Sequence, residues 1–135
     1  MSWHSWTEDG YGIPLGDIEH VKKFLIKREK DKDIVANLKR VDDFSEIEDI
    51  YGDPAAWVVA GIIKHETGYD SLIGFMCCGD TNFEDHLGFT PQFPWALKEK
   101  DKGLTIDKAD KILKKYAREL GVDEEPDYFM AEYCG

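Results

Sequence analysis

The apolar residues of this chain change their spacing in a set order, and that order limits the fold more than any other feature. They recur every three or four residues in two segments, 18–25 and 106–120, as in amphipathic helices. Short aromatic or apolar runs typical of strands stand near both ends and at 72–78. Strands and helices do not alternate regularly. We therefore predict an α+β fold, with a small, mostly antiparallel sheet packed against three or four helices.

Turn and capping residues place the elements of the first third of the chain. Aromatic residues around an Asp9-Gly10 step, a recognised hairpin signal, predict a β element within 3–15. Asp17 can cap the helix that follows it. The segment 34–41 fits a short helix or a strand, and its periodicity does not decide between them.

Two more helices are expected before the middle of the chain. Ser45 and Glu48 have the spacing of a capping box and predict a short helix that Gly52 ends. Asp53-Pro54 suits an N-cap and first helical position for a buried helix over 55–67. Because β-branched residues are frequent in this run, a strand over 57–63 is the competing interpretation.

The second half of the chain is expected to complete the sheet. The run 72–78 suits an interior strand, and 79–94 an ordered loop with one edge strand at most. The amphipathic helix begins after Thr105 and ends at Gly121. A last strand is expected over 128–133.

Length and composition indicate one folded unit in a reducing compartment. The chain has 135 residues, of which 42% are hydrophobic, and we expect one domain over 1–135. No secretory signal opens the sequence, and no apolar run is long enough to span a membrane. The three cysteines form no even disulfide framework, so a cytoplasmic protein is expected.

The formal charge of -11 restricts the choice of partner. It repels phosphate backbones and anionic membranes, so neither direct nucleic-acid binding nor membrane association is expected. A field of this sign favours a basic protein as partner, although many soluble proteins carry a similar surplus for solubility alone.

The acidic residues are grouped, and one group is the predicted contact surface. On a helix, Asp42, Glu46 and Asp49 would share one face, and like charges at that spacing repel unless a cation relieves them. Trp3 and Trp6, near the terminus among polar residues, are added as aromatic contacts. The predicted partner-binding residues are Asp42, Asp43, Glu46, Glu48, Asp49, Trp3 and Trp6.

A second hypothesis is a small cysteine-dependent enzyme. Cys77 or Cys78 would be the nucleophile, and His86 or His65 the base that removes its proton. The plainer interpretation places the cysteines in a strand as small apolar residues. No cofactor or dedicated metal motif is found, and a hard cation near Asp85 stays open, with Asp80 and Glu84 as further ligands.

The leading hypothesis is a small acidic binding protein that neutralises a basic, nucleic-acid-handling partner. Anti-restriction proteins, anti-CRISPR inhibitors and immunity proteins against toxins are of this type, and phage or mobile-element genes commonly encode such inhibitors. A structural protein that assembles only with itself is the third hypothesis. The sequence leaves the partner's identity and the oligomeric state open.

Overall fold

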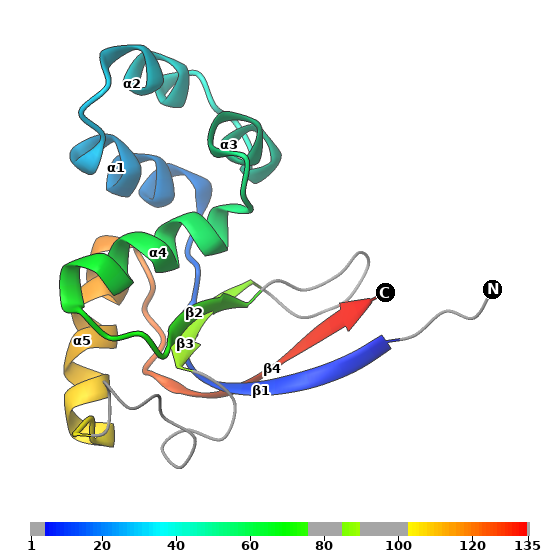
Figure 1. The fold of residues 1–135 in the computed structure, drawn as a ribbon, viewed down its shortest axis with the longest axis vertical. Coiled ribbons are helices and arrows are strands. Elements are labelled where there is room, and N and C mark those ends of the chain that lie inside the picture. Colours follow the sequence, from blue (N-terminus) through cyan, green and yellow to red (C-terminus); the bar gives the residue numbers. More distant parts are fainter. Residues whose placement is uncertain (1–4, 76–84, 90–102, 135) are drawn as a thin grey trace.

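The computed structural model of the chain describes residues 5–75, 85–89 and 103–134, and the side chains of 10–75, 85–89 and 103–130. Five helices and four strands lie in these described ranges, which confirms the predicted α+β class. In chain order (Figure 1) they are β1 (Ser5–Pro14), α1 (Ile18–Arg28), α2 (Lys32–Lys39), α3 (Phe44–Tyr51), α4 (Ala55–Thr67), β2 (Leu72–Phe75), β3 (His86–Phe89), α5 (Ile106–Glu119) and β4 (Asp127–Cys134). The segment that fitted helix or strand equally is the helix α2.

The strands form one antiparallel sheet in the order β2-β3-β1-β4. β1 pairs with β4 over eight residue pairs that end at Gly12↔Asp127, but with β3 only over its last residues, Tyr11–Pro14. The β1–β4 ribbon therefore extends beyond β2 and β3, as Figure 1 shows. Most of β4 is paired on one side only within the described chain.

Two expectations about the strands are corrected. Asp9-Gly10 makes no turn, because both residues continue β1 and pair with Met130 and Phe129 of β4. A Cβ at Gly10 would lie 2.6 Å from the ring of Phe129, so this glycine admits a neighbouring ring instead of turning the chain. The strand found within 79–94 is β3, and it lies inside the sheet between β2 and β1 instead of at an edge.

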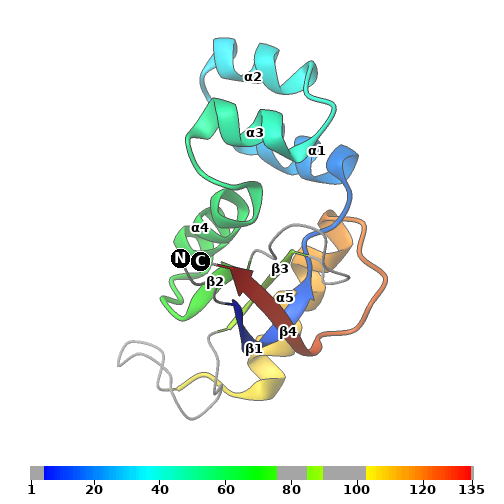
Figure 2. The same cartoon turned by 90° about the vertical axis from the view of Figure 1, so that its right-hand side faces the viewer.

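Helices cover one face of the sheet in two layers. α4 packs against β2 and β3, and α5 packs against β1. Tyr11 of β1 donates a hydrogen bond from its hydroxyl to Asp110 of α5, at 2.5 Å. α1, α2 and α3 lie over α4 on the side away from the sheet (Figures 1 and 2). α4 is thus the central helix, between the sheet and the three-helix group.

The core fills the spaces between these layers. It draws on the helix-facing side chains of β1, β2 and β3 and on the inner faces of all five helices. The largest fully buried side chains are Ile13, Phe24, Leu25, Leu38, Ile47, Ile63, Leu72, Phe75, Leu87, Phe89 and Tyr116. Burying a side chain of this size contributes about 1.5–3 kcal/mol, so apolar contact supplies most of the stability.

The helix ends confirm some caps and correct others. Asp17 caps α1, and glycines in the left-handed conformation end α3 and α4, with φ of 79° at Gly52 and 80° at Gly68. The cap of α3 is Asp43, not Ser45, because the chain is still extended at Asp43 and already helical at Ser45.

The start and interior of α4 also differ from the expectation. The N-cap of α4 is Pro54, one residue after the predicted Asp53, and no side chain caps this end. The strand considered for 57–63 is excluded, because these residues lie within the helix. In the sheet, β2 occupies 72–75 of the predicted strand, and 76–78 lie outside the described residues.

Candidate partner-binding surface

The acidic residues predicted to contact a partner gather on α3 and on the turn before it. The Asp43 carboxylate accepts hydrogen bonds from the hydroxyl of Ser45, at 2.7 Å, and from the backbone N–H of Glu46, at 3.0 Å. The Glu46 carboxylate accepts one from the backbone N–H of Asp42, at 3.1 Å. These bonds hold negative charge at the N-terminus of a helix, where the helix dipole stabilises it. The Ser45 hydroxyl and then the Glu46 N–H keep the pKa of Asp43 below its usual value.

The other acidic side chains of this group face solvent and form no ion pair among the described residues. Asp42, Glu48 and Asp49 are exposed. In the part of the chain that the structure describes, no lysine or arginine forms an ion pair with any of the five carboxylates at 42–49. Lys39 and Arg40 closely precede the group and could offset part of its charge, whereas residues 42–63 contain six acidic and no basic residues. We call these six residues the α3 carboxylates: Asp42, Asp43, Glu46, Glu48, Asp49 and Asp53.

The second acidic block behaves differently. It consists of Asp123, Glu124, Glu125 and Asp127, which precede and begin β4. Glu125 lies 3.3 Å from Lys114 of α5. Both side chains are largely exposed, so this pair contributes at most about 1 kcal/mol to stability. It nevertheless places a cation beside the second block, whereas the α3 carboxylates form no ion pair among the described residues.

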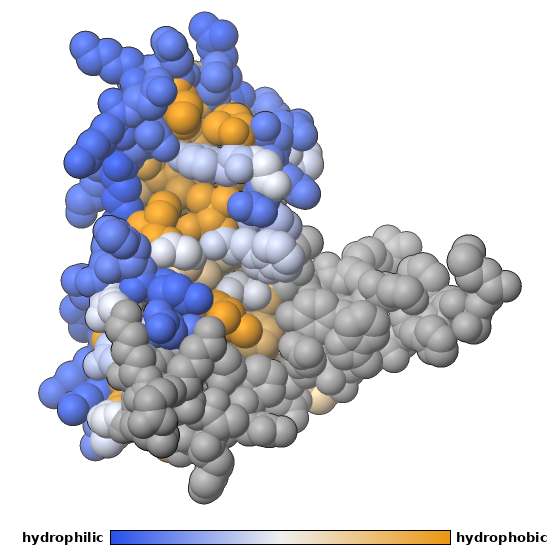
Figure 3. Space-filling view, in the orientation of Figure 1, coloured by the Kyte–Doolittle hydropathy of each residue, from blue (hydrophilic) through white to orange (hydrophobic). Residues whose placement is uncertain are grey.

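An apolar groove adjoins the α3 carboxylates. It has a volume of about 820 Å³ and runs between α1, the end of α3 and α4. Tyr51 and Asp53 line it on the α3 side, and Val58 and Ile62 line it on α4. At and just after the end of α1 it is lined by the charged residues Lys27, Glu29 and Lys30. Figure 3 shows an apolar strip in this region, bordered by hydrophilic residues of the three-helix group. We call this feature the α4 groove.

Trp57 is the most prominent side chain of the α4 groove. It is 52% exposed, although tryptophan is usually well buried. A second hollow, of about 330 Å³, lies beside it and is lined by Ile73 and Gly74 of β2. Trp57 thus stands between two depressions, and a large aromatic side chain in such a place is a common anchor for a partner protein.

The position of Trp57 follows from the phase of α4. The buried residues of this helix, Ala56, Val59, Ala60 and Ile63, form one stripe at helical spacing. Trp57 lies outside that stripe, on the face of Gly61 and His65, which are exposed. The expectation that the whole helix 55–67 is buried is therefore wrong for Trp57, which is 52% exposed. The helical spacing of Trp57, Gly61 and His65 was the signal that could have revealed it.

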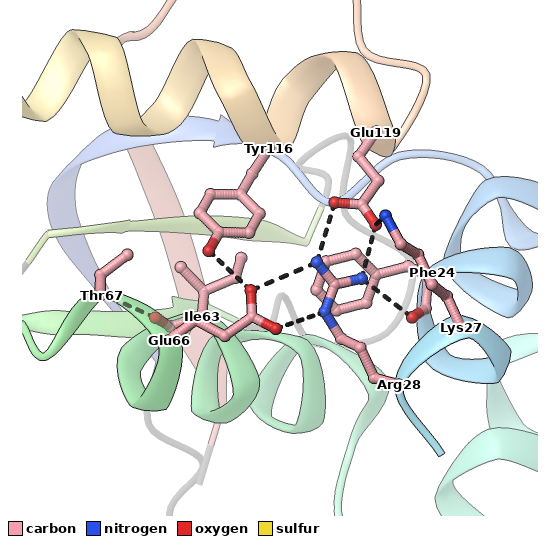
Figure 4. Close-up of polar contacts among 8 residues, drawn as sticks. All are labelled: Phe24, Lys27, Arg28, Ile63, Glu66, Thr67, Tyr116 and Glu119. Carbon is pink, nitrogen blue, oxygen red and sulfur yellow. Dashed lines mark hydrogen bonds and ion pairs between the residues drawn. The ribbon is translucent and has the colours of Figure 1, made fainter. Parts of the chain in front are cut away.

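A network of charged side chains forms one wall of the α4 groove (Figure 4). Arg28 of α1 lies between Glu66 of α4 and Glu119 of α5. Its Nε is 2.6 Å from Glu66 Oε2, and its Nη1 and Nη2 are 2.5 and 2.9 Å from the two oxygens of Glu119. Tyr116 donates to Glu66 at 2.8 Å. One guanidinium therefore joins three helices that are far apart in sequence.

The Arg28 network is electrostatically satisfied. The hydrogen-bonded guanidinium lowers the pKa of both Glu66 and Glu119, and the two carboxylates, Glu119 first, raise the pKa of Arg28. Arg28 also lies over the ring of Phe24, 3.8 Å from its centroid. Its charge is thus used inside the molecule, and the network supports the groove wall instead of offering a free cation.

The remaining predicted residues are placed apart from α3. Trp3 lies outside the described residues, and Trp6 is placed by its backbone only, opposite Tyr133 in the β1–β4 ribbon. Cys77 and Cys78 also lie outside the described residues, so the cysteine hypothesis stays a prediction. The two candidate bases are not together, because His65 lines the α4 groove and His86 stacks on Phe129, 4.2 Å between ring centroids, beside another hollow.

The described residues contain neither a cluster of metal-ligating side chains nor a helix that could cross a membrane. Asp80 and Glu84 fall outside these residues, and within them no three His, Cys, Asp or Glu side chains are grouped as metal ligands. Among the described helices, none has the length and the apolar content that crossing a membrane requires.

The surface that emerges from the described residues is therefore a row of acidic side chains beside an apolar groove with an exposed tryptophan. Comparison of the chain with protein-family models, with curated proteins and with solved structures finds no match in any of the three.

Proposed function

We propose that this chain is an acidic binding protein that docks on a basic protein through the α3 carboxylates and the α4 groove. The observation that carries the proposal is the adjacency of the two features. Asp53 belongs to the acidic row and also lines the groove that Trp57 occupies. A partner surface with a cationic region beside an apolar side chain would contact both at once.

Electrostatics favours such a partner. Acidic side chains three or four residues apart on one helix face repel each other by about 0.2–0.5 kcal/mol per pair. A cationic surface relieves that repulsion and gains from the field of a chain with a net charge of -11. This attraction acts mainly on the association rate, and it weakens as salt is added.

The α4 groove would provide the short-range part of the affinity. Binding energy at protein interfaces is concentrated in a few buried aromatic and arginine anchors, and exposed charges add less. Trp57 would gain the most free energy from being covered by a partner, because about half of its large apolar surface is exposed to water. Covering it would strengthen the complex, while the α3 carboxylates would set its orientation.

The partner class we infer is a protein that handles nucleic acid. Such a protein carries a cationic surface shaped for a row of phosphates. Among the α3 carboxylates, Glu46 and Asp49 lie one turn apart on the helix, about 5–6 Å between their Cβ atoms, and the acidic residues that flank α3 extend the negative charge beyond both helix ends. An acidic protein bound there would act as an inhibitor, as anti-restriction and anti-CRISPR proteins and immunity proteins do.

Affinity capture with matched variants tests the proposal. The immobilised wild-type chain, a Glu48→Lys/Asp49→Lys variant and a Trp57→Ala variant are exposed to the same lysate at low salt, and retained proteins are identified by mass spectrometry. Glu48 and Asp49 make no described side-chain contact, so their replacement leaves the fold intact. The control is Asp123→Lys/Glu124→Lys, an equal change of charge at exposed residues of the second acidic block.

We expect the wild type and the control to retain the same basic protein, which high salt releases. Both surface variants should lose it, and about tenfold weaker binding would correspond to 1.4 kcal/mol. Retention of no basic protein by the wild type at low salt contradicts the proposal. Equal retention by the Glu48→Lys/Asp49→Lys variant and the control would place the contact elsewhere.

A further inference from the structure

A second exposed apolar surface lies far from the α4 groove, on β4. Four large apolar side chains are exposed among the described residues, and three of them, Ile106, Tyr128 and Met130, belong to α5 and β4. Tyr128 is 54% and Met130 48% exposed. Because they are two residues apart in a strand, they point to the same face of the sheet.

This surface is continuous with the packed core. Tyr128 pairs with Tyr11 across the sheet, and their rings meet edge to face with centroids 4.9 Å apart. The hydroxyl of Tyr11 is bonded to Asp110, one helical turn after Ile106 on α5. Tyr128 and Met130 therefore stand at the margin of the helix-covered face, where α5 no longer shields them.

The outer backbone edge of β4, at the same place, has no partner strand among the described residues. β4 is the last strand in the order β2-β3-β1-β4. Natural edge strands are usually protected by charged residues, above all lysine, or by proline, a bulge or a covering segment. β4 contains neither lysine nor proline, and it is eight residues long, which is long for an edge strand.

We infer that β4 is a self-association surface, on which the β4 strand of a second copy of this chain adds in antiparallel orientation. A two-fold axis perpendicular to the sheet would then join two four-stranded sheets into one of eight strands. Such an interface is self-complementary, because each copy offers the same strand. The inference is independent of the proposed function, which concerns α3 and α4.

The charges of β4 suit a second copy. Its two acidic residues, Asp127 and Glu132, stand near opposite ends, and its centre is uncharged. In a pairing centred on Met130, each copy would place Tyr128 opposite Glu132, so no acidic residue would face another across the interface. The exposed side chains of Met130 and Tyr128 from both copies would lie on the same face, in a strip that is apolar at its centre and has Glu132 of each copy opposite Tyr128 of the other.

Sedimentation velocity over two orders of magnitude of protein concentration tests the inference. We expect a monomer–dimer equilibrium that shifts toward dimer at high salt, because two chains of charge -11 repel each other. Met130→Lys adds a charge to the apolar strip and should raise the dissociation constant about tenfold or more. Trp57→Lys is the matched control, with a similarly exposed apolar residue on α4.

Amide hydrogen exchange of the wild type adds a test that needs no variant. Outward-facing amides of β4 should exchange more slowly at high protein concentration than at low, while those of α3 should not change. A wild type that stays monomeric throughout overturns the inference. So does a dimer that Met130→Lys leaves intact. The opposite salt dependence keeps this result distinct from partner binding at α3, which salt weakens.

Discussion

Replacing Arg28 by methionine gives the sharpest test of what holds the helices together. The substitution keeps an unbranched apolar stem but removes the guanidinium that bonds Glu66 on α4 and Glu119 on α5. It also leaves the carbonyl of Phe24 without the donor that now lies 3.1 Å away. Two carboxylates and a carbonyl would then have to find water in a partly enclosed place.

The exposure of the three side chains sets the expected magnitude. Removing one partner of a fully buried ion pair costs about 3–5 kcal/mol, whereas a fully exposed pair contributes about 0–1 kcal/mol. Arg28 is 18% exposed, Glu119 24% and Glu66 35%, so the network lies between these limits and nearer the buried one. We expect Arg28→Met to lower the free energy of unfolding by about 2–3 kcal/mol at neutral pH.

The cost should depend on pH, with a definite sign. The guanidinium lowers the pKa of Glu66 and Glu119 in the folded state. Their contribution is therefore present above the unfolded pKa of about 4.3 and is lost as the pH falls through the lowered folded values. On acidification, the free energy of unfolding should fall more for the wild type than for Arg28→Met. The difference in free energy of unfolding between the two proteins should therefore become smaller below about pH 4.

Urea unfolding followed by circular dichroism at neutral and acidic pH measures both effects. Lys27→Met is the control, since Lys27 is 73% exposed and its Nζ is 3.9 Å from Glu119, so its loss should cost less than about 0.5 kcal/mol. An Arg28→Met cost below about 1 kcal/mol at neutral pH, or a cost that stays constant on acidification, would refute the reasoning.

Three further stability predictions use the same urea assay. Gly12→Ala should lower the free energy of unfolding by about 3 kcal/mol or more, because the added Cβ would lie 1.9 Å from a β3 carbonyl oxygen. Gly61→Ala, in an exposed helix interior with open space around it, should raise the free energy of unfolding by about 0.5–1 kcal/mol. Similar effects of the two substitutions would contradict this prediction. Asp43→Ala should cost about 1 kcal/mol and Asp43→Asn much less, if capping and not charge matters. Tyr11→Phe should cost about 1–2 kcal/mol through the lost bond to Asp110, and an unchanged unfolding midpoint would show that this bond contributes nothing.

Several features were predictable from local patterns. The spacing of apolar residues by three or four predicted α1 and α5, because residues at this spacing lie on one face of a helix and can be buried together. Gly52 and Gly68 were recognised as helix ends, since glycine enters the left-handed conformation at little cost. Of the three acidic residues expected to share a helix face, Glu46 and Asp49 lie on α3, whereas Asp42 precedes the N-cap Asp43 and is outside the helix.

Other features could not be predicted from local patterns. Asp9-Gly10 has the composition of a turn, yet it continues a strand because Phe129, more than a hundred residues later, packs against Gly10. The strand β3 lies inside the sheet because β1 and β2 pair with its two edges. Such pairings join residues that are far apart in sequence, and the spacing of apolar residues within one segment carries no information about them.

The sequence alone determined the α+β class, the amphipathic helices and the acidic face of α3, because these depend on residue type and on the period of a helix or strand. Only the tertiary structure closed the α4 groove by bringing α1 beside Tyr51 and Trp57, joined Arg28 to Glu66 and Glu119, and left β4 at an edge. These arrangements follow from how helices and strands pack against one another, and packing depends on the whole chain at once.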